Sequence, residues 1–241
     1  GIPGLGDPVI HARTAKYFGL NYESVHNHLT RAGYGEALTI ELPMPSGRNI
    51  QFALKPNTTM QPGLQAKFPS IRTFDGLSTD GQRIQAKVDV TPAGLHAMVA
   101  LPNGTVFIDP VFLNQNEIYI VYRRSDFTTD KTFECLIGET SGPDSEPKSG
   151  SSYGNCELNV YRLAMAATGE YTQFHGGTVE LAMAAIATTV NRVNQVYERD
   201  ISVTLTLIDN NDEIVYTNPA TDPYSNNNPF AMLNQNQSNL N

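Results

Sequence analysis

Tryptophan is absent from the 241 residues of the chain, and cysteine occurs only twice. Two cysteines exclude a dense disulfide framework, and neither of them stands in a CxxC metal or redox motif. No run of about 18 apolar residues occurs, so we predict no membrane-spanning helix. The N-terminus, GIPGLGDPVIHA, lacks the basic and apolar regions of a signal peptide, and we expect any export signal to be absent from this chain.

Charge is also scarce, because only 17% of the residues are Asp, Glu, Lys or Arg. Acidic residues outnumber basic ones by 24 to 16, and the net charge of -8 is spread along the chain. A partner such as nucleic acid is therefore not expected. With 40% hydrophobic residues, the chain has enough apolar material for one large or two ordinary domains.

The clearest boundary lies at residues 138–155, where turn formers and charged residues replace apolar ones. Such a composition predicts an exposed linker. We therefore expect one domain in residues 1–137 and a second in residues 156–241.

The first domain is expected to be mainly antiparallel β-structure with one short helix. Residues 22–32 suit a helix, with Asn21 as its N-cap and Gly33 as its stop. Short segments rich in β-formers alternate with prolines and an Asn-Gly pair, which is typical of hairpins. The expected strands are residues 37–42, 50–54, 82–90, 94–100, 106–108 and 117–122.

The second domain shows a different pattern. Residues 158–167 form a nearly continuous apolar run, which suits a buried strand. In residues 177–199 apolar side chains recur every three or four positions, as expected of a long helix. The opposite face of this helix is polar and carries Asn191, Arg192, Asn194, Gln195 and Glu198.

A second strand is expected after this helix. Residues 201–207 alternate apolar and polar, so this strand should bury the face of Ile201, Val203, Leu205 and Leu207. Strand, helix and strand imply a right-handed βαβ unit, and a further helix begins near residue 230. The fold class is therefore α+β: a mainly antiparallel β domain, followed by the incomplete βαβ start of an α/β domain.

Several stretches carry a family resemblance. YRLAMAATGEY at residues 161–171, FHGG at 174–177, NRVNQVY at 191–197 and TDPY at 221–224 resemble the start of bacterial reprolysin-like metallopeptidases, within the metzincin class. More loosely, KFPSIRTF at 67–74, GLHAM at 94–98 and PNGTVFIDP at 102–110 are similar to the propeptide of the same proteins. The resemblance implies a secreted bacterial zinc endopeptidase precursor that acts on proteins or peptides, with a propeptide in residues 1–137 and an activation cleavage in the linker.

The family holds its zinc through the three histidines of HExxHxxGxxH, with the glutamate as general base. The five histidines here are residues 11, 26, 28, 96 and 175, and none stands in an HExxH motif. The chain would therefore be inactive alone. We expect most zinc ligands on the remainder of the catalytic domain, which would be a partner of this chain.

Cys135 stands just before the linker, where metzincin precursors commonly place a cysteine that binds the catalytic zinc. A thiolate on the zinc would displace the water that the metal must activate, so Cys135 is a candidate inhibitory ligand. One alternative is a disulfide between Cys135 and Cys156, which would close the linker into a loop. Cys156 could instead pair with a cysteine beyond Asn241, or the thiols could be unpaired.

Calcium is a second metal to consider. Asp209 and Asp212 lie in a cluster of oxygen-bearing residues, but the spacing lacks the glycine and distal glutamate of an EF-hand, so a polar turn is favoured. Glu170, in the Thr-Gly-Glu-Tyr stretch, is a further candidate for calcium or for structural pairing. As an alternative to the protease precursor, the chain would be a non-catalytic secreted inhibitor or an adhesion-type binding module.

Overall fold

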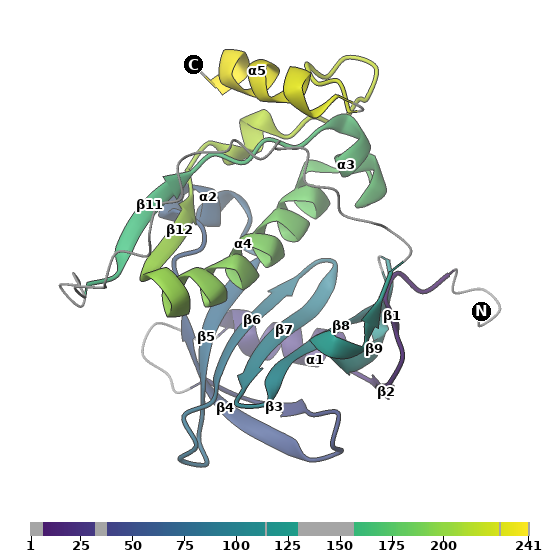
Figure 1. The fold of residues 1–241 in the computed structure, drawn as a ribbon, viewed down its shortest axis with the longest axis vertical. Helices are drawn as coiled ribbons and strands as arrows, with labels where there is room; N and C mark the ends of the chain where they lie inside the picture. The colour runs from purple at the N-terminus through teal and green to yellow at the C-terminus, as the bar shows by residue number, and fades with distance from the viewer. Residues whose placement is uncertain (1–6, 32–37, 114, 130–156, 227, 241) are drawn as a thin grey trace, which may run out of the picture.

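The computed structural model describes residues 7–31, 38–113, 115–129, 157–226 and 228–240. We call described residues 7–129 the N-terminal half and described residues from 157 onward the C-terminal segment. The fold is mixed α and β and contains a large antiparallel sheet, with α1 on one side of the sheet and α4 on the other (Figure 1). No helix in these described ranges is long and apolar enough to cross a membrane.

The large sheet has eight strands in the order β2-β9-β8-β7-β6-β5-β4-β3, and each neighbouring pair is antiparallel. From β3 to β9 the order in space follows the order in sequence, as expected when prolines and glycines make tight connections. The strands are β2 (Ala15–Gly19), β3 (Leu38–Pro43), β4 (Asn49–Pro56), β5 (Arg72–Ser78), β6 (Gln85–Thr91), β7 (Gly94–Leu101), β8 (Gly104–Phe112) and β9 (Gln115–Arg123).

Helix α1 (Tyr22–Arg31) packs on one face of the sheet, close to β6 and β7. Its predicted N-cap is confirmed, because Asn21 Oδ1 accepts a hydrogen bond from Ser24 N at 3.0 Å. Leu29 of the helix lies in the same core as Val88 and Val90 of β6, and all three are buried. A hydrophobic core therefore fills the space between α1 and this face of the sheet.

Several short elements of the N-terminal half were not predicted. The largest are strand β5 and helix α2 (Pro62–Lys67). In β5 the polar pair Asp75-Gly76 interrupts the apolar pattern, and α2 has only six residues. The others are β2, the strand β1 (His11–Ala12), which pairs with β10 (Phe127–Thr128), and the 3₁₀ turn η1 (Arg124–Asp126).

The C-terminal segment contains the predicted strand, helix and strand. Its strands β11 (Asn159–Leu163) and β12 (Val203–Leu207) are parallel, and helix α4 (Val179–Ile201) connects them. Thr178 caps the start of α4, and Ser202 ends it in the left-handed conformation at φ 54°. The other elements are α3 (Gly169–Phe174), the 3₁₀ turn η2 (Asn211–Ile214) and α5 (Pro229–Leu240), which lies at the far end of the molecule (Figure 1).

Two predictions about burial in the strands are wrong. Strand β11 is exposed rather than buried, with 64% of Val160 and 57% of Tyr161 accessible to solvent, because it pairs only with β12 among the described strands. Ile201 belongs to the end of α4 and is exposed, whereas Thr204 and Thr206 of β12 are buried. Of the other residues predicted to be buried, Leu207 is buried and Val203 and Leu205 are half-buried. In both strands, burial depends on which other element packs against each face. The order of apolar and polar residues in the sequence does not specify that element.

The polar face of α4, which the sequence places opposite the apolar stripe, is largely buried. Asn191 is 0% exposed, Asn194 is 2% exposed and Gln195 is 5% exposed. Asn191 Nδ2 donates to Val88 O of the large sheet, and Asn194 Nδ2 donates to Leu205 O of β12. The helix is therefore covered on two sides, by β12 and by the N-terminal half.

The predicted boundary between two domains stays a prediction. The linker, residues 138–155, lies outside the described residues, as does the end of the first predicted domain. On either side of that gap the two parts share a hydrophobic core. Met60, Leu64 and Ile71 of the N-terminal half are buried together with residues of α4 and β12. The N-terminal half and the C-terminal segment are therefore in contact through this core.

Candidate functional site

The candidate site is the polar surface between α4 and the large sheet. In β6 successive side chains point to opposite faces, so Val88 and Val90 enter the core with α1 while Lys87 and Asp89 point to α4. The sequence of β6 therefore places two charged side chains under the polar face of α4. Two cavities open beside this surface.

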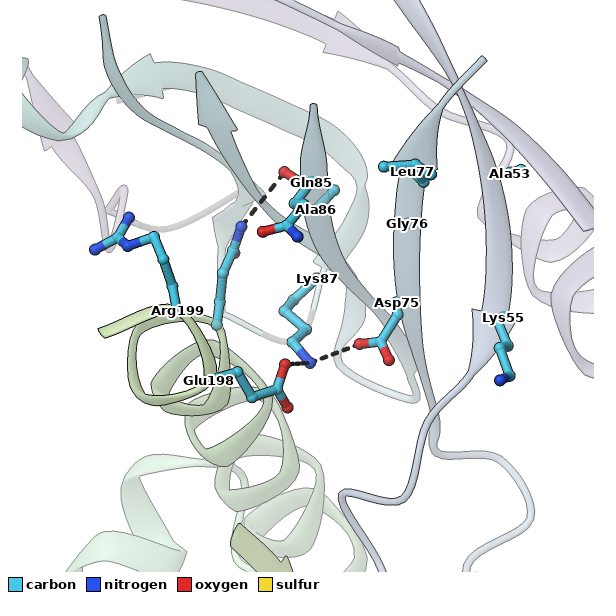
Figure 2. Close-up of a pocket in the computed structure, with 11 residues that line it drawn as sticks. Ala53, Lys55, Asp75, Gly76, Leu77, Gln85, Ala86, Lys87, Glu198 and Arg199 are labelled. Carbon is cyan, nitrogen blue, oxygen red and sulfur yellow. Dashed lines mark hydrogen bonds and ion pairs between the residues drawn. The ribbon is translucent and has the colours of Figure 1, made fainter. Parts of the chain in front are cut away.

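Lys87 occupies the centre of the first cavity, which measures about 380 Å³ (Figure 2). Its Nζ lies 2.6 Å from Asp75 Oδ1 of β5 and 2.7 Å from Glu198 Oε2 of α4, and its side chain is only 5% exposed. Thr204 Oγ1 donates to the other oxygen of Glu198 at 2.9 Å. This ammonium group thus links the large sheet to the C-terminal end of α4.

Arg192 makes a second ionic contact between the same two parts. Its Nη2 donates to Asp109 Oδ1 of β8, and Tyr122 OH donates to Asp109 Oδ2 at 3.0 Å. The guanidinium carbon lies 5.1 Å from the centre of the Phe107 ring, a cation–π distance. Burial would lower the pKa of Arg192, but the carboxylates of Asp109 and Asp89 outweigh it and raise that pKa.

Asp89 is 1% exposed and is surrounded by donors. Its Oδ2 accepts from Thr188 Oγ1 at 2.7 Å and lies 3.1 Å from His96 Nδ1, while Asn191 Nδ2 is 3.4 Å from Oδ1. Because a carboxylate only accepts hydrogen bonds, the proton between these groups belongs on His96 Nδ1. His96 of β7 is thus hydrogen-bonded to the neighbouring strand β6.

The second cavity, of about 300 Å³, lies beside these two charge pairs. The ring centres of His175 and Tyr171 lie 4.5 Å apart, with the ring planes tilted by 52°. Burial lowers the pKa of His175 and raises the pKa of Tyr171 to about 12. Polar residues of this cavity come from both parts of the chain: His96, Asp109, Tyr171, His175, Thr188 and Arg192.

Asn57, at the end of β4, extends the same surface toward β12. Its Nδ2 donates to Asn191 Oδ1 at 2.9 Å, and its Oδ1 accepts from Thr73 Oγ1 at 2.6 Å and from Thr59 Oγ1 at 2.9 Å. A hydrogen-bonded network therefore runs from the large sheet to α4. Two buried atoms of α4, Arg192 Nε and Gln195 Oε1, have no hydrogen-bond partner in the described structure.

Chemically, this arrangement is an interface rather than a reaction centre. Its charged groups are paired across the two parts of the chain, and none of them forms a nucleophile with an adjacent base. In the described ranges no group of three His, Cys, Asp or Glu residues could hold a metal ion. These residues do not fit a catalytic zinc, and we derive no catalytic step from them.

The predicted calcium residues lie apart from this interface. Glu170 is exposed in the first turn of α3. Asp209 Oδ1 accepts hydrogen bonds from Gly63 N and Leu64 N, and Asp212 pairs with Lys67 at 2.7 Å. These carboxylates have protein partners, and calcium binding by them stays a prediction.

The two cysteines, Cys135 and Cys156, lie outside the described residues, so the predicted zinc ligand and the predicted disulfide stay predictions. His26 is half-buried and His28 is exposed. Both ring Nε2 atoms lie near backbone oxygens: that of His26 is 3.4 Å from Ser70 O, and that of His28 is 3.0 Å from Thr39 O.

The charged residues of the interface were not predicted as a site. The available signal was a strand, residues 85–91, in which Lys87 and Asp89 alternate with valine and alanine. Charged residues at every second position of such a strand indicate that this face is in contact with either solvent or another polar element. Only the position of α4 decides between the two.

Comparison with known proteins gives one match and one negative result. A search of curated protein sequences finds no match to the chain. A family model described as metallo-peptidase family M12B, reprolysin-like, matches residues 158–241. The matched range includes β11, α4 and β12, the strand, helix and strand of the C-terminal segment. Residues 158–241 are therefore similar to the reprolysin-like family of metallopeptidases.

Proposed function

We propose that the chain is the N-terminal portion of a secreted, zinc-dependent metalloendopeptidase precursor whose N-terminal half keeps the protease latent. The reprolysin-like match of residues 158–241 supports the peptidase part of this proposal. The substrates are proteins or peptides, and the catalytic histidines lie in the remainder of the catalytic domain.

One observation carries the inhibitory role. The large sheet of the N-terminal half covers the polar face of α4, which belongs to the reprolysin-like range. This contact relies on paired charges and hydrogen bonds, as in interfaces that form and separate, rather than on a wholly apolar core. Such a surface suits a domain that is bound in the precursor and removed on activation.

Cys135 supplies the chemical part of the latency. It lies between the N-terminal half and the reprolysin-like range, next to the linker at residues 138–155 that is cut on activation. Zinc, when bound, supplies the Lewis acid that activates the attacking water, and a Cys135 thiolate on the metal keeps that water away.

The test is the peptidase activity of the complete precursor, with zinc present, in the wild-type, Cys135→Ala and Cys156→Ala forms. The proposal predicts that Cys135→Ala alone raises activity before any cleavage. Cys156→Ala is the matched control, because a disulfide between the two cysteines would make both variants behave alike. Equal latency of the wild type and Cys135→Ala would rule out the cysteine mechanism.

A further inference from the structure

Residues 57–71 of the N-terminal half, which we call the docking segment, lie against the C-terminal segment rather than in the large sheet. The segment runs from the end of β4 through α2 to the start of β5. Its first residue, Asn57, is already bonded to Asn191 of α4.

The docking segment joins the sheet of the C-terminal segment through one parallel β-bridge at Leu207, the last residue of β12. Gln61 N donates to Leu207 O at 2.9 Å, and Leu207 N donates to Thr59 O at 2.9 Å, which makes a parallel bridge between Met60 and Leu207. The outer edge of β12 is thereby paired. This is strand addition, in which backbone hydrogen bonds supply affinity and side chains supply specificity.

Apolar side chains of the docking segment complete the core of the C-terminal segment. Met60 is 4% exposed, and Leu64 and Ile71 are 0% exposed. They pack in one cluster with Met183 and Leu207. Without them this core would be open to water on one side.

Polar contacts fix the position of the docking segment. Asp209 Oδ1 accepts from Gly63 N at 2.7 Å and from Leu64 N at 3.2 Å, and Asp209 N donates to Gln61 Oε1 at 3.0 Å. A Cβ on Gly63 would stand 2.7 Å from Asp209 Oδ1, so this close approach requires glycine. Beyond it, Lys67 pairs with Asp212 at 2.7 Å.

We infer that the docking segment is the element by which the N-terminal half holds the reprolysin-like domain, and that the two parts stay bound to each other after the linker is cut. The partner surface on the C-terminal segment is the outer edge of β12 with Asp209 and Asp212 beyond it. It fits a peptide with a buried apolar residue, followed by a short helix that begins with Pro-Gly and ends with a lysine. The consequence for activation rests on the proposed function: if the N-terminal half is the inhibitor, cleavage of the linker alone does not release it.

The experiment uses the full chain with a site-specific protease sequence placed within residues 138–155. After cutting, size-exclusion chromatography and a dilution series measure whether the two pieces co-elute, and with what dissociation constant. We expect co-elution of the wild type. For Asp209→Ala we expect a dissociation constant about tenfold higher, since two backbone hydrogen bonds to a charged acceptor are lost.

Asp200→Ala is the matched control, because Asp200 pairs with Arg199 of its own helix, and we expect no change. A second comparison, on the N-terminal half, is between Lys67→Ala and Lys55→Ala. We expect Lys67→Ala to raise the dissociation constant more than Lys55→Ala does. Both pairs are compared only after thermal melting shows that the uncut variants fold. A peptide of residues 55–73 should also compete with the cut N-terminal half, whereas a scrambled peptide should not.

Separation of the wild-type pieces on cutting would overturn the inference, and so would equal effects of Asp209→Ala and Asp200→Ala. Neither measurement depends on peptidase activity. Failure of the cysteine mechanism would therefore leave the docking result intact, and a latent precursor whose cut pieces separate would overturn the docking alone.

Discussion

At the scale of single residues, the alternation of side chains in β6 does most to shape the interface. Val88 and Val90 face the core with α1, and Lys87 and Asp89 face α4. A strand buried on both faces normally carries apolar residues on both. Here one face is charged, and each of its charged groups has a partner on α4 or a neighbouring strand.

Lys87→Met tests the ion pairs at the first cavity. The substitution leaves Asp75 and Glu198 without their shared cation, but Asp75 is 50% exposed and keeps water contact. We expect a loss of about 2 kcal/mol in the free energy of unfolding, below the full effect of breaking a dry ion pair. Urea unfolding measures it, with Lys55→Met, an exposed lysine two strands away on β4, as the control. A loss as small as that of the control would mean that the pair contributes nothing.

Gly169→Ala tests the close approach at the start of α3. A Cβ at Gly169 would lie 2.2 Å from Pro219 N and 2.4 Å from Asn218 C, and backbone cannot move aside cheaply. We expect a loss of about 2–4 kcal/mol. Gly81→Ala is the comparison: it meets no atom within 4 Å but adopts φ +80°, so about 1 kcal/mol is expected. Calorimetry of both variants would refute the packing account if Gly81→Ala were the worse of the two.

His175 gives a pH dependence. Burial lowers its pKa from the ordinary value of 6.5, so its neutral form is favoured in the folded state. The unfolded chain then binds more protons, and stability is complete above about pH 6.5 and falls as the pH drops toward the lowered folded value. Thermal melting between pH 5 and pH 8 should show a smaller dependence for His175→Gln than for the wild type. The control is His28→Gln, which replaces an exposed histidine. If it reduced the pH dependence of the melting temperature as much as His175→Gln does, His175 would not be the cause.

At the scale of elements, α4 is the centre of the molecule, since it packs on β12 and on the large sheet. Its existence and its limits follow from the apolar repeat and from the Thr178 cap, both readable in the sequence. Which face is buried does not follow, because an asparagine or arginine stripe faces solvent unless another element offers matching polar groups. Strand β5 was not predicted for a related reason. Asp75 pairs with Lys87 of the next strand, and Gly76 lets Leu54 and Ala86 approach closely, but both residues interrupt the local pattern expected of a strand.

Asn191→Leu tests how α4 is attached to the sheet. Asn191 is 0% exposed and bonds with Asn57 and with Val88 O, so leucine would leave both partners unsatisfied in a dry environment. We expect a loss of about 2–3 kcal/mol. Thr189→Ala, on the exposed side of the same helix, should change stability by less than about 1 kcal/mol. Chemical denaturation compares them, and equal losses would show that the network adds nothing to the attachment.

At the scale of the whole molecule, two parts that are far apart in sequence are joined twice: by the polar face of α4 and by the docking segment. The order of elements in each part was largely predictable from periodicity and turn residues. Their mutual contacts were not, because long-range pairing leaves no local pattern. Neither candidate residue of the latency mechanism, Cys135 or Cys156, lies in the described range, so its test is biochemical.

The measurement that tests the central claim most directly is peptidase activity, with zinc present, of the complete precursor before and after its N-terminal half is removed. The account predicts low activity in the precursor and a rise of at least about tenfold once the linker is cut and the N-terminal half is separated. Activity that is the same before and after removal would contradict it.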